Sequence, residues 1–324
     1  MKLNSRNINS GVSIIICCFN SAERIKSTLD KIFNQRNTLR INIEIIVVDN
    51  NSTDNTSLIA SEALAAQTSF KSTIVHEKKQ GLVYARMRGI ESASYSVTIF
   101  CDDDNWLDDN YIETAYTFMN ANTQVGMLGG QISPFANIKI PSWFFTYGEK
   151  YAVGVPRLSS GDTTDIGYVW GAGSVLRTEF LKHMYSSNFE PLLSGRSGTS
   201  LGAGDDSEIA KWVIASGYRL WYLDELHLSH YMPNSRLEIS KLILTLESGK
   251  ESVKVLKAYD FAVFYITKHI SHLKKQDYLK TIYAILSAGI NFFKLDKKHR
   301  DHIIYHTRRA HGFCIKSSDS QTFI

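Results

Sequence analysis

Short runs of β-branched residues alternate with segments of helical periodicity along the first hundred residues, and this alternation limits the fold more than any other feature. The apolar runs predict strands at residues 12–18, 43–48, 73–76 and 97–101. Ile25, Leu29 and Ile32 recur at three-to-four spacing after the first run, which predicts a helix in that crossover. Strands joined by helices form mainly parallel sheets, so we expect an α/β fold with helices flanking the sheet.

Polar clusters follow three of these strands at the point where each strand ends. They are Cys18-Phe19-Asn20, Asp49-Asn50-Asn51-Ser52 and Asp102-Asp103-Asp104. In open parallel sheets, ligands bind in the crevice beyond the carboxyl ends of the strands. The three clusters are therefore expected to converge on one ligand site.

The acidic cluster after the fourth strand suggests a metal site. If strand geometry continues past residue 101, the side chains of Asp102 and Asp104 share one face. Two carboxylates favour a hard cation such as Mg²⁺ or Mn²⁺, which would bridge to a diphosphate. The alternative is a solvated acidic turn, or a cap for the helix predicted from Tyr111.

The second part of the chain contains a second acidic cluster. Residues 131–169 lose periodicity, which predicts loops around the site. A Gly- and Ser-rich stretch, 194–204, precedes Asp205 and Asp206, after which a helix and a strand at 219–228 are expected. Adjacent carboxylates should raise one pKa of the pair, which suits a general base, although Asp205 with Glu208 also has the spacing of a helix capping box.

Beyond Pro233 the sequence becomes helical in period and basic. Residues 235–324 carry 16 Lys and Arg against 8 Asp and Glu, whereas the whole chain has a net charge of only +4. This balance suggests anionic lipid or nucleic acid as a partner, and we expect peripheral contact with an anionic membrane and no nucleic acid. The apolar segment 278–293 could lie in the membrane interface, or could form a plain helix packed on the rest of the protein.

Five ordered segments together resemble family two glycosyltransferases, which are inverting enzymes with the GT-A fold. The segments are Val12-Ser13-Ile14-Ile15-Ile16 to Asn20, Val47-Val48-Asp49 to Asp54, Gly81 to Gly89, Asp102 to Asp104, and Gly204 to Glu208. The resemblance covers about residues 11–233. It implies a Rossmann-like GT-A domain at 1–233, with a nucleotide-sugar half at about 11–105 and an acceptor half at about 106–233, followed by a basic helical extension at 234–324.

The resemblance also implies roles for individual residues. Phe19 would flank the nucleobase, Asp49 would contact it, and Arg86 would line the nucleotide pocket. The full set expected at the nucleotide is Cys18, Phe19, Asn20, Asp49, Asn51, Arg86, Asp102 and Asp103. The metal ligands would be Asp104, Asp102 and His230. His230 can equally be a structural histidine, because it lies at the end of a predicted strand and His227 is close to it in the sequence. Asp206 would be the catalytic base, with Asp205 as the competing candidate, and Trp170-Gly171-Ala172-Gly173 would form the acceptor side or simply a tight turn.

The resemblance leads us to expect an inverting, metal-dependent transfer of a hexosyl or N-acetylhexosaminyl group in surface-polysaccharide assembly. The donor would be a nucleoside diphosphate sugar, UDP most readily, and the acceptor a glycan or lipid-linked hydroxyl. Cys17-Cys18 stands where the family often has Pro-Thr, and Met87 where Asn is common, so nucleobase specificity is open. A nucleotidyltransferase and a non-catalytic nucleotide-sugar-binding module are the alternatives. The nucleotidyltransferase is disfavoured because a Gly-rich basic loop is absent after the first strand. The binding module is disfavoured because it would not need the acid at Asp206.

The cellular location follows from cysteine usage and hydropathy. Four cysteines without CxxC spacing suggest a reducing compartment. We expect no signal peptide and no spanning helix, because no apolar run reaches about 18 residues. A cytoplasmic protein, with the inner face of the cell membrane as a peripheral location, fits these features.

Overall fold

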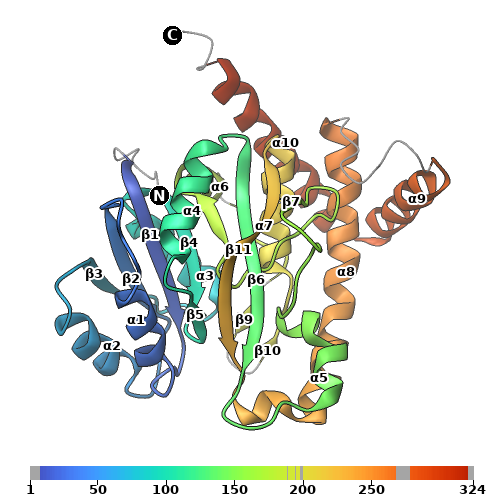
Figure 1. The fold of residues 1–324 in the computed structure, drawn as a ribbon. Coiled ribbons are helices and arrows are strands. Elements are labelled where there is room, and N and C mark those ends of the chain that lie inside the picture. Colours follow the sequence, from blue (N-terminus) through green and yellow to red (C-terminus); the bar gives the residue numbers. More distant parts are fainter. Residues whose placement is uncertain (1–7, 188, 194, 198–199, 268–277, 320–324) are drawn as a thin grey trace.

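The computed structural model describes residues 8–319 except 188, 194, 198–199 and 268–277 (Figure 1). A mixed sheet with the order β3-β2-β1-β4-β8-β6-β11-β5 runs through the molecule, and β7 adds to β11. Its strands are β1 (Asn9–Cys18), β2 (Ile43–Asp49), β3 (Lys71–His76), β4 (Tyr95–Asp102), β5 (Asn105–Leu107), β6 (Val125–Phe135), β7 (Gly161–Asp162), β8 (Val175–Arg177) and β11 (Arg219–Tyr231). Strands β9 (Arg196–Ser197) and β10 (Ser200–Leu201) form a separate hairpin.

Six strands of the large sheet run parallel, and β5, β7 and β8 run against them. Alternate side chains of β1 pack on opposite faces, with Ile14 and Ile16 in one core and Ile15 in the other. A sheet buried on both faces requires helices on both, which explains the continuous apolar run of this strand. The mainly parallel α/β sheet expected from the sequence is confirmed.

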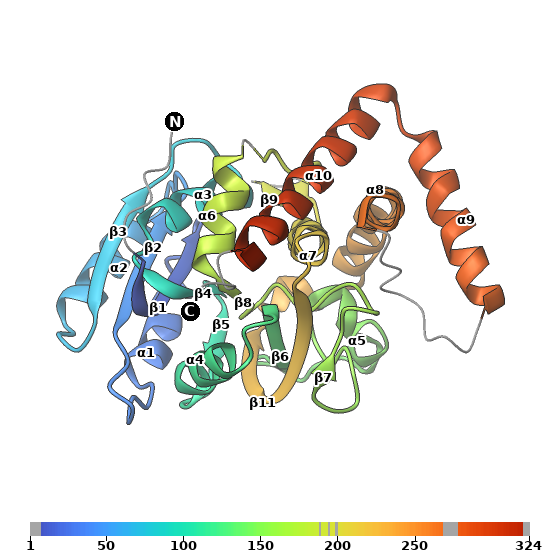
Figure 2. The same cartoon turned by 90° about the horizontal axis from the view of Figure 1, so that it is seen from above.

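Helices cover both faces of the sheet (Figure 2). On one face lie α1 (Ile25–Phe33), α2 (Thr56–Ala65) and α4 (Tyr111–Ala121), and on the other lie α3 (Leu82–Ser92), α6 (Thr178–Ser186) and α7 (Asp205–Ala215). Short helical turns α5 (Ser142–Thr146), η1 (Gly148–Tyr151) and η2 (Asn234–Leu237) occur in the connections. The helix predicted from Ile25 is therefore confirmed, as is the one before strand 219–228.

Three C-terminal helices follow, α8 (Ile239–Thr267), α9 (Tyr278–Lys294) and α10 (Lys297–Asp319) (Figures 1 and 2). α8 and α10 pack against α7 and against each other, and α9 packs against α8. Tyr259 of α8 donates a hydrogen bond of 2.6 Å to Glu208 of α7, and Lys211 of α7 pairs with Asp260 at 2.7 Å. The C-terminal helical extension is thus confirmed as helical and fastened to the sheet domain. A boundary at Pro233 stays a proposal, because η2 and α8 reach the site described below.

Two predictions about strand ends were wrong. β6 continues through residues 131–135, where loops were expected, and β11 continues to Tyr231, so that His230 lies inside a strand. The two extensions pair with each other, from Gln131 opposite His227 to Phe135 opposite Tyr231. Residues 131–135, which include Pro134, have only a weak local preference for a strand, and they are extended because they pair with a distant strand. Part of the predicted loop at 194–204 lies outside the described residues.

None of the described helices has an apolar stretch long enough to span a bilayer.

Candidate active site

A cavity of about 650 Å³ lies beyond the carboxyl ends of β1 and β4, where the polar clusters were expected to converge. Its described lining runs from Cys17 in β1 to Leu256 in α8. The amino-terminal ends of α3 and α7 also face it, through Gly81 and Asp205. Six carboxylates and four Lys or Arg side chains belong to this lining. Carboxylates therefore outnumber Lys and Arg side chains around this cavity.

The acidic cluster does not continue the strand. β4 ends at Asp102, and Asp103 and Asp104 form a turn, so the expected alternation of Asp102 and Asp104 on one strand face is wrong. The reason is local: the side chain of Asn105 accepts the Asp102 N–H at 3.1 Å and donates to Asp104 at 3.1 Å, which folds the chain back. All three carboxylates nevertheless line the cavity.

The three carboxylates have different partners. Asp103 accepts hydrogen bonds from Ser21 and from Arg24, the latter at 2.9 Å. Asp104 lies 3.3 Å from His230 Nε2 and 3.1 Å from Arg236 Nη1. Burial would raise the pKa of Asp104, but His230 and Arg236 lower it below its usual value, whereas burial and Asp104 raise the pKa of Asp103. Burial likewise raises the pKa of Asp102, against the effect of Arg86.

The expected metal ligands suit a hard cation by side-chain type, and all three line the same cavity. Asp104 is held ionised, His230 presents Nε2 toward it, and Asp102 lines the same cavity. Within the described ranges, no three His, Cys, Asp or Glu side chains are already grouped as a coordination shell. Arg236 contacts two of the atoms that a cation would need. Metal binding therefore requires a rearrangement of this side chain.

Arg86 and Asp205 form a buried ion pair in the second half of the site, with side chains only 5% and 10% exposed. Burial would lower the pKa of Arg86, but Asp205 raises it, and the guanidinium also lies 5.0 Å from the ring centre of Phe100. Arg86 lines the cavity as expected, yet its charge is already matched by Asp205. No local sequence pattern indicates this pairing, because the two residues are 119 positions apart.

Asp206 lies in the same cavity and has no cationic partner among its hydrogen bonds in the described structure. One carboxylate oxygen accepts the Gly171 N–H at 3.0 Å, and the other accepts the Ser207 N–H at 2.7 Å. Burial and the neighbouring Asp205 raise its pKa to about 6, against the effect of Arg86. A carboxylate poised near neutral pH and open to a cavity has the properties of a general base.

The capping-box alternative for the second acidic cluster is wrong. α7 begins after Gly204, which has a left-handed backbone, and no side chain caps it. The Glu208 carboxylate instead accepts the N–H groups of Leu192 and Leu193, both at 2.9 Å, besides the Tyr259 hydroxyl. Asp205 and Glu208 therefore hold the surroundings of Asp206 in place, and do not serve the helix end.

The segment before β8 forms a tight turn and also reaches the cavity. Trp170, Gly171 and Ala172 line the cavity, whereas Gly173 has a φ of 71° and its carbonyl accepts the Tyr111 hydroxyl at 2.7 Å. A Cβ on Gly171 would lie 2.6 Å from Asp206 Oδ2. Only glycine lets this backbone approach the carboxylate, so the tight turn is confirmed, whereas the acceptor-side role of the segment stays a prediction.

The first two polar clusters reach the cavity only in part. Cys18 and Phe19 line it, but Asn20, Asp49 and Asn51 do not. Asp49 instead accepts the Ser52 N–H at 3.0 Å, and Asn20 accepts the Thr53 N–H at 2.9 Å. Their predicted contacts with the nucleotide remain predictions.

Asn50 and Arg236 are among the lining residues that sequence reasoning missed. Asn50 lines the cavity and joins the loop after β2 to the start of α3, accepting the Gly81 N–H at 2.7 Å. Its place in a polar cluster could have indicated it. Arg236 follows a proline turn in a segment without any motif, so no sequence signal pointed to it.

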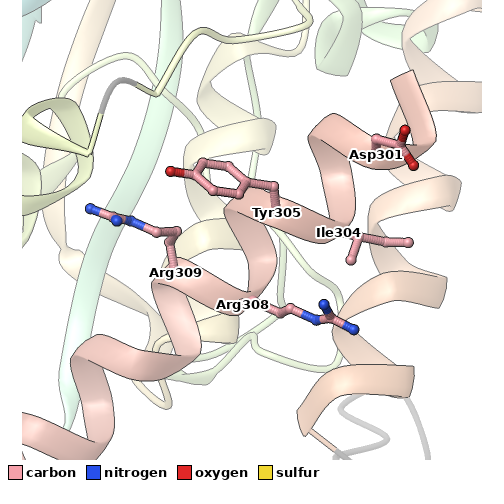
Figure 3. A pocket seen from close by; sticks show the side chains of 5 residues that line it. All are labelled: Asp301, Ile304, Tyr305, Arg308 and Arg309. Carbon is pink, nitrogen blue, oxygen red and sulfur yellow. The ribbon is translucent and has the colours of Figure 1, made fainter. Parts of the chain in front are cut away.

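A second hollow lies on the surface of α10, lined by Asp301, Ile304, Tyr305, Arg308 and Arg309 (Figure 3). All five residues belong to one helix, and the side chains of Arg308 and Arg309 extend away from each other. The first cavity, in contrast, is lined by side chains from several strands, helices and loops. We therefore assign the candidate site to the cavity at the sheet edge.

Comparison with known proteins defines the class of the chain. The model of the family described as glycosyl transferase family 2 matches residues 13–184, more than half of the chain. The protein therefore belongs to glycosyl transferase family 2, a family of glycosyltransferase enzymes, and the fold is of the GT-A type seen in solved members.

Individual relatives are more distant. The chain is similar to the putative glycosyltransferase EpsH of Bacillus subtilis, with 34% identity over 102 residues, and to glycosyltransferase AglE of Haloferax volcanii, with 31% over 121 residues. These matches cover 32% and 37% of this chain and only 28% and 39% of the relatives.

Two solved structures share the fold over nearly the whole chain. The first is S. aureus TarS 1–349 in complex with UDP-GlcNAc, with a TM-score of 0.54, 14% identity, and 96% of this chain and 92% of that chain covered. The second is the mannosyltransferase PcManGT of Pyrobaculum calidifontis in complex with GDP-Man and Mn²⁺, with a TM-score of 0.50, 17% identity, and 95% and 88% covered.

Proposed function

We propose that the protein is an inverting, metal-dependent glycosyltransferase that moves a sugar from a nucleoside diphosphate donor, UDP-sugar first, to a hydroxyl of a glycan or lipid-linked acceptor. The observation that carries this proposal is that one cavity contains two carboxylates with different surroundings, Asp104 beside His230 and Arg236, and Asp206 without a cationic partner among its hydrogen bonds in the described structure. Asp104 with His230 offers a cation site, and Asp206 is a base with a pKa of about 6. Arg86 is held by Asp205 and does not neutralise Asp206 directly.

This arrangement suits a single displacement. Asp206 accepts the proton of the acceptor hydroxyl, whose oxygen bonds to the anomeric carbon while the bond from that carbon to the diphosphate oxygen breaks. Attack from the face opposite the leaving group inverts the anomeric centre. General-base assistance of this kind contributes about 10² to 10⁴-fold. The Gly171 and Ser207 N–H groups fix the orientation of the base.

A divalent cation, when bound by Asp104, His230 and Asp102, would offset negative charge on the leaving diphosphate. The excess of carboxylates over Lys and Arg in the cavity supports this need, because a diphosphate alone would be repelled. Complexes named for UDP-GlcNAc in TarS, and for GDP-Man with Mn²⁺ in PcManGT, support a nucleotide sugar with a divalent cation.

Thermal unfolding with a panel of nucleotide sugars, each with Mn²⁺, Mg²⁺ or a chelator, tests the donor proposal. We expect one or a few UDP-sugars to raise Tm only in the presence of metal. Asp104→Ala should abolish metal-dependent UDP binding in calorimetric titration while the variant stays folded. UDP affinity unchanged by the variant and by chelator would remove these carboxylates from the donor site.

Membrane contact is proposed for the outer face of α9. Tyr283, Leu286, Ile290 and Phe293 recur at three-to-four spacing there, and each is more than half exposed. The opposite face packs inward through Phe292, whose ring centre lies 5.1 Å from that of Phe261 in α8. α9 contains no Asp or Glu. An apolar stripe on a helix without acidic residues fits an anionic bilayer surface.

A second copy of the chain fits this stripe less well. Four side chains offer on the order of 500 Å², below the roughly 800 Å² that each partner buries in a stable complex. Lys294, Lys297 and Lys298 next to the stripe would also face like charges across a twofold interface. A location on the inner face of the cell membrane, beside a lipid-linked acceptor, is therefore the proposal.

Liposome sedimentation tests the membrane surface. The intact chain should sediment with anionic vesicles and dissociate at raised salt, because surface attraction decays over about 8 Å at physiological ionic strength. Leu286→Gln with Ile290→Gln should weaken sedimentation, whereas Leu39→Gln, at an exposed apolar position of the sheet domain, should not. Equal sedimentation with neutral vesicles, or concentration-dependent dimers that the α9 variant abolishes, would overturn the proposal.

A further inference from the structure

Arg236 bridges the two firmest candidate metal ligands. Its Nη1 lies 2.9 Å from His230 Nε2 and 3.1 Å from Asp104 Oδ2, and the same Asp104 carboxylate lies 3.3 Å from His230 Nε2. The side chain is only 18% exposed and lines the cavity. A single guanidinium thus occupies the position between a carboxylate and an imidazole nitrogen where a cation binds.

The position of Arg236 conflicts with a cation at the same place. A guanidinium can only donate, so at Asp104 it takes a carboxylate oxygen that a cation would use. It also lies within contact distance of His230 Nε2, the ring nitrogen that faces Asp104. The other ring nitrogen, Nδ1, is buried and has no hydrogen-bond partner in the described structure. A cation between Asp104 and His230 would therefore have to displace Arg236.

We infer that Arg236 and a divalent cation compete for Asp104 and His230, so that Arg236 is the counter-ion of this pair in the nucleotide-free protein and leaves when metal binds with the donor. This inference rests on the proposed function and deepens it. It predicts that metal alone binds weakly, because binding costs the two charge-assisted contacts of Arg236. It also predicts that the diphosphate favours metal binding by providing additional ligand oxygens and an anion for the released guanidinium.

Mn²⁺ titration followed by electron paramagnetic resonance of the free ion tests the competition without any turnover. Wild-type protein should bind Mn²⁺ weakly alone and at least about tenfold more tightly with UDP. Arg236→Gln should bind Mn²⁺ about tenfold more tightly than wild type without UDP, and the gain should disappear in the double variant Arg236→Gln, His230→Ala. Circular dichroism and thermal unfolding establish that each variant is folded.

Arg24→Gln is the matched control. Arg24 also lines the cavity and is paired with a carboxylate of the same turn, but it contacts Asp103 and not Asp104 or His230. A general change in charge would tighten Mn²⁺ binding equally in both variants, and that result would overturn the competition, as would an Arg236→Gln variant no tighter than wild type. Wild-type protein that binds UDP equally well with chelator would instead refute the metal-dependent function itself.

Discussion

Replacing Asp205 and Asp206 one at a time distinguishes the proposed catalytic base, Asp206, from the carboxylate that pairs with Arg86, Asp205. Asp206→Asn removes the charge but keeps one carbonyl oxygen, so one of the two backbone N–H contacts, from Gly171 or Ser207, is lost or weakened. The loss of one such hydrogen bond costs about 1 kcal/mol, which for a chain of 324 residues is a fall in Tm of roughly 1–2 °C. Transfer should fall by about 10² to 10⁴-fold, because no ionisable group remains to accept the proton.

Asp205→Asn should have the opposite balance. It leaves the Arg86 guanidinium, whose side chain is 5% exposed, without its partner charge. Breaking a buried pair typically costs about 3–5 kcal/mol, and since Asn still accepts a hydrogen bond we expect about 3 kcal/mol. For a chain of 324 residues this is a fall in Tm of roughly 4–5 °C. Transfer measured well below that temperature should fall far less than in Asp206→Asn.

Thermal unfolding and initial rates of sugar transfer, measured on both variants at one temperature, give the comparison. UDP binding by Asp206→Asn should remain near that of wild type, which shows that the donor site is intact. A reversed result, with the rate lost in Asp205→Asn and the stability lost in Asp206→Asn, would make Asp205 the base. Undiminished transfer in both variants would refute the mechanism.

Two further predictions follow from the surroundings of Asp206. As the proposed base, Asp206 must be ionised to act, and its pKa is raised to about 6. The value of kcat/KM should therefore be constant above about pH 6 and fall tenfold for each pH unit below it. A kcat/KM already constant from pH 4.5 upward would contradict this assignment. Gly171→Ala should slow transfer at least about tenfold without loss of UDP binding, because its Cβ would lie 2.6 Å from Asp206 Oδ2 and displace the carboxylate. Gly312→Ala in α10, where a Cβ would meet nothing within 4 Å, should transfer at the wild-type rate.

The parallel strands of the sheet and the location of the site at their carboxyl ends could be predicted from the sequence, because both depend on short-range patterns. Apolar runs such as 12–18 and the polar residues that follow them are visible in any window of the chain. The pairing of Arg86 with Asp205 is not visible, since either residue alone resembles a solvent-exposed charge. The same holds for Arg236, whose position depends on the turn after β11 bringing η2 back to Asp104.

Register in long strands was also beyond local reasoning. Residues 131–135 contain Ser133 and Pro134 and are extended only because residues 227–231 supply partners in register. The extension matters for chemistry, since it places His230 beside the acidic turn, where the backbone N–H of Tyr231 donates to the Asp104 carbonyl at 2.9 Å. A local pattern could propose His230 but could not fix which carboxylate it meets.

The lining of the cavity, which extends from Cys17 to Leu256, has a consequence for synthesis on the ribosome. β1 to β4 pair among themselves, so this part of the nascent sheet can form as soon as residues up to Asp102 have emerged. The base, Arg236 and the α8 wall follow more than a hundred residues later. Until then the nascent chain carries the carboxylates of Asp102 to Asp104 without the groups that enclose them, and the site is complete only when residues up to Leu256 have emerged.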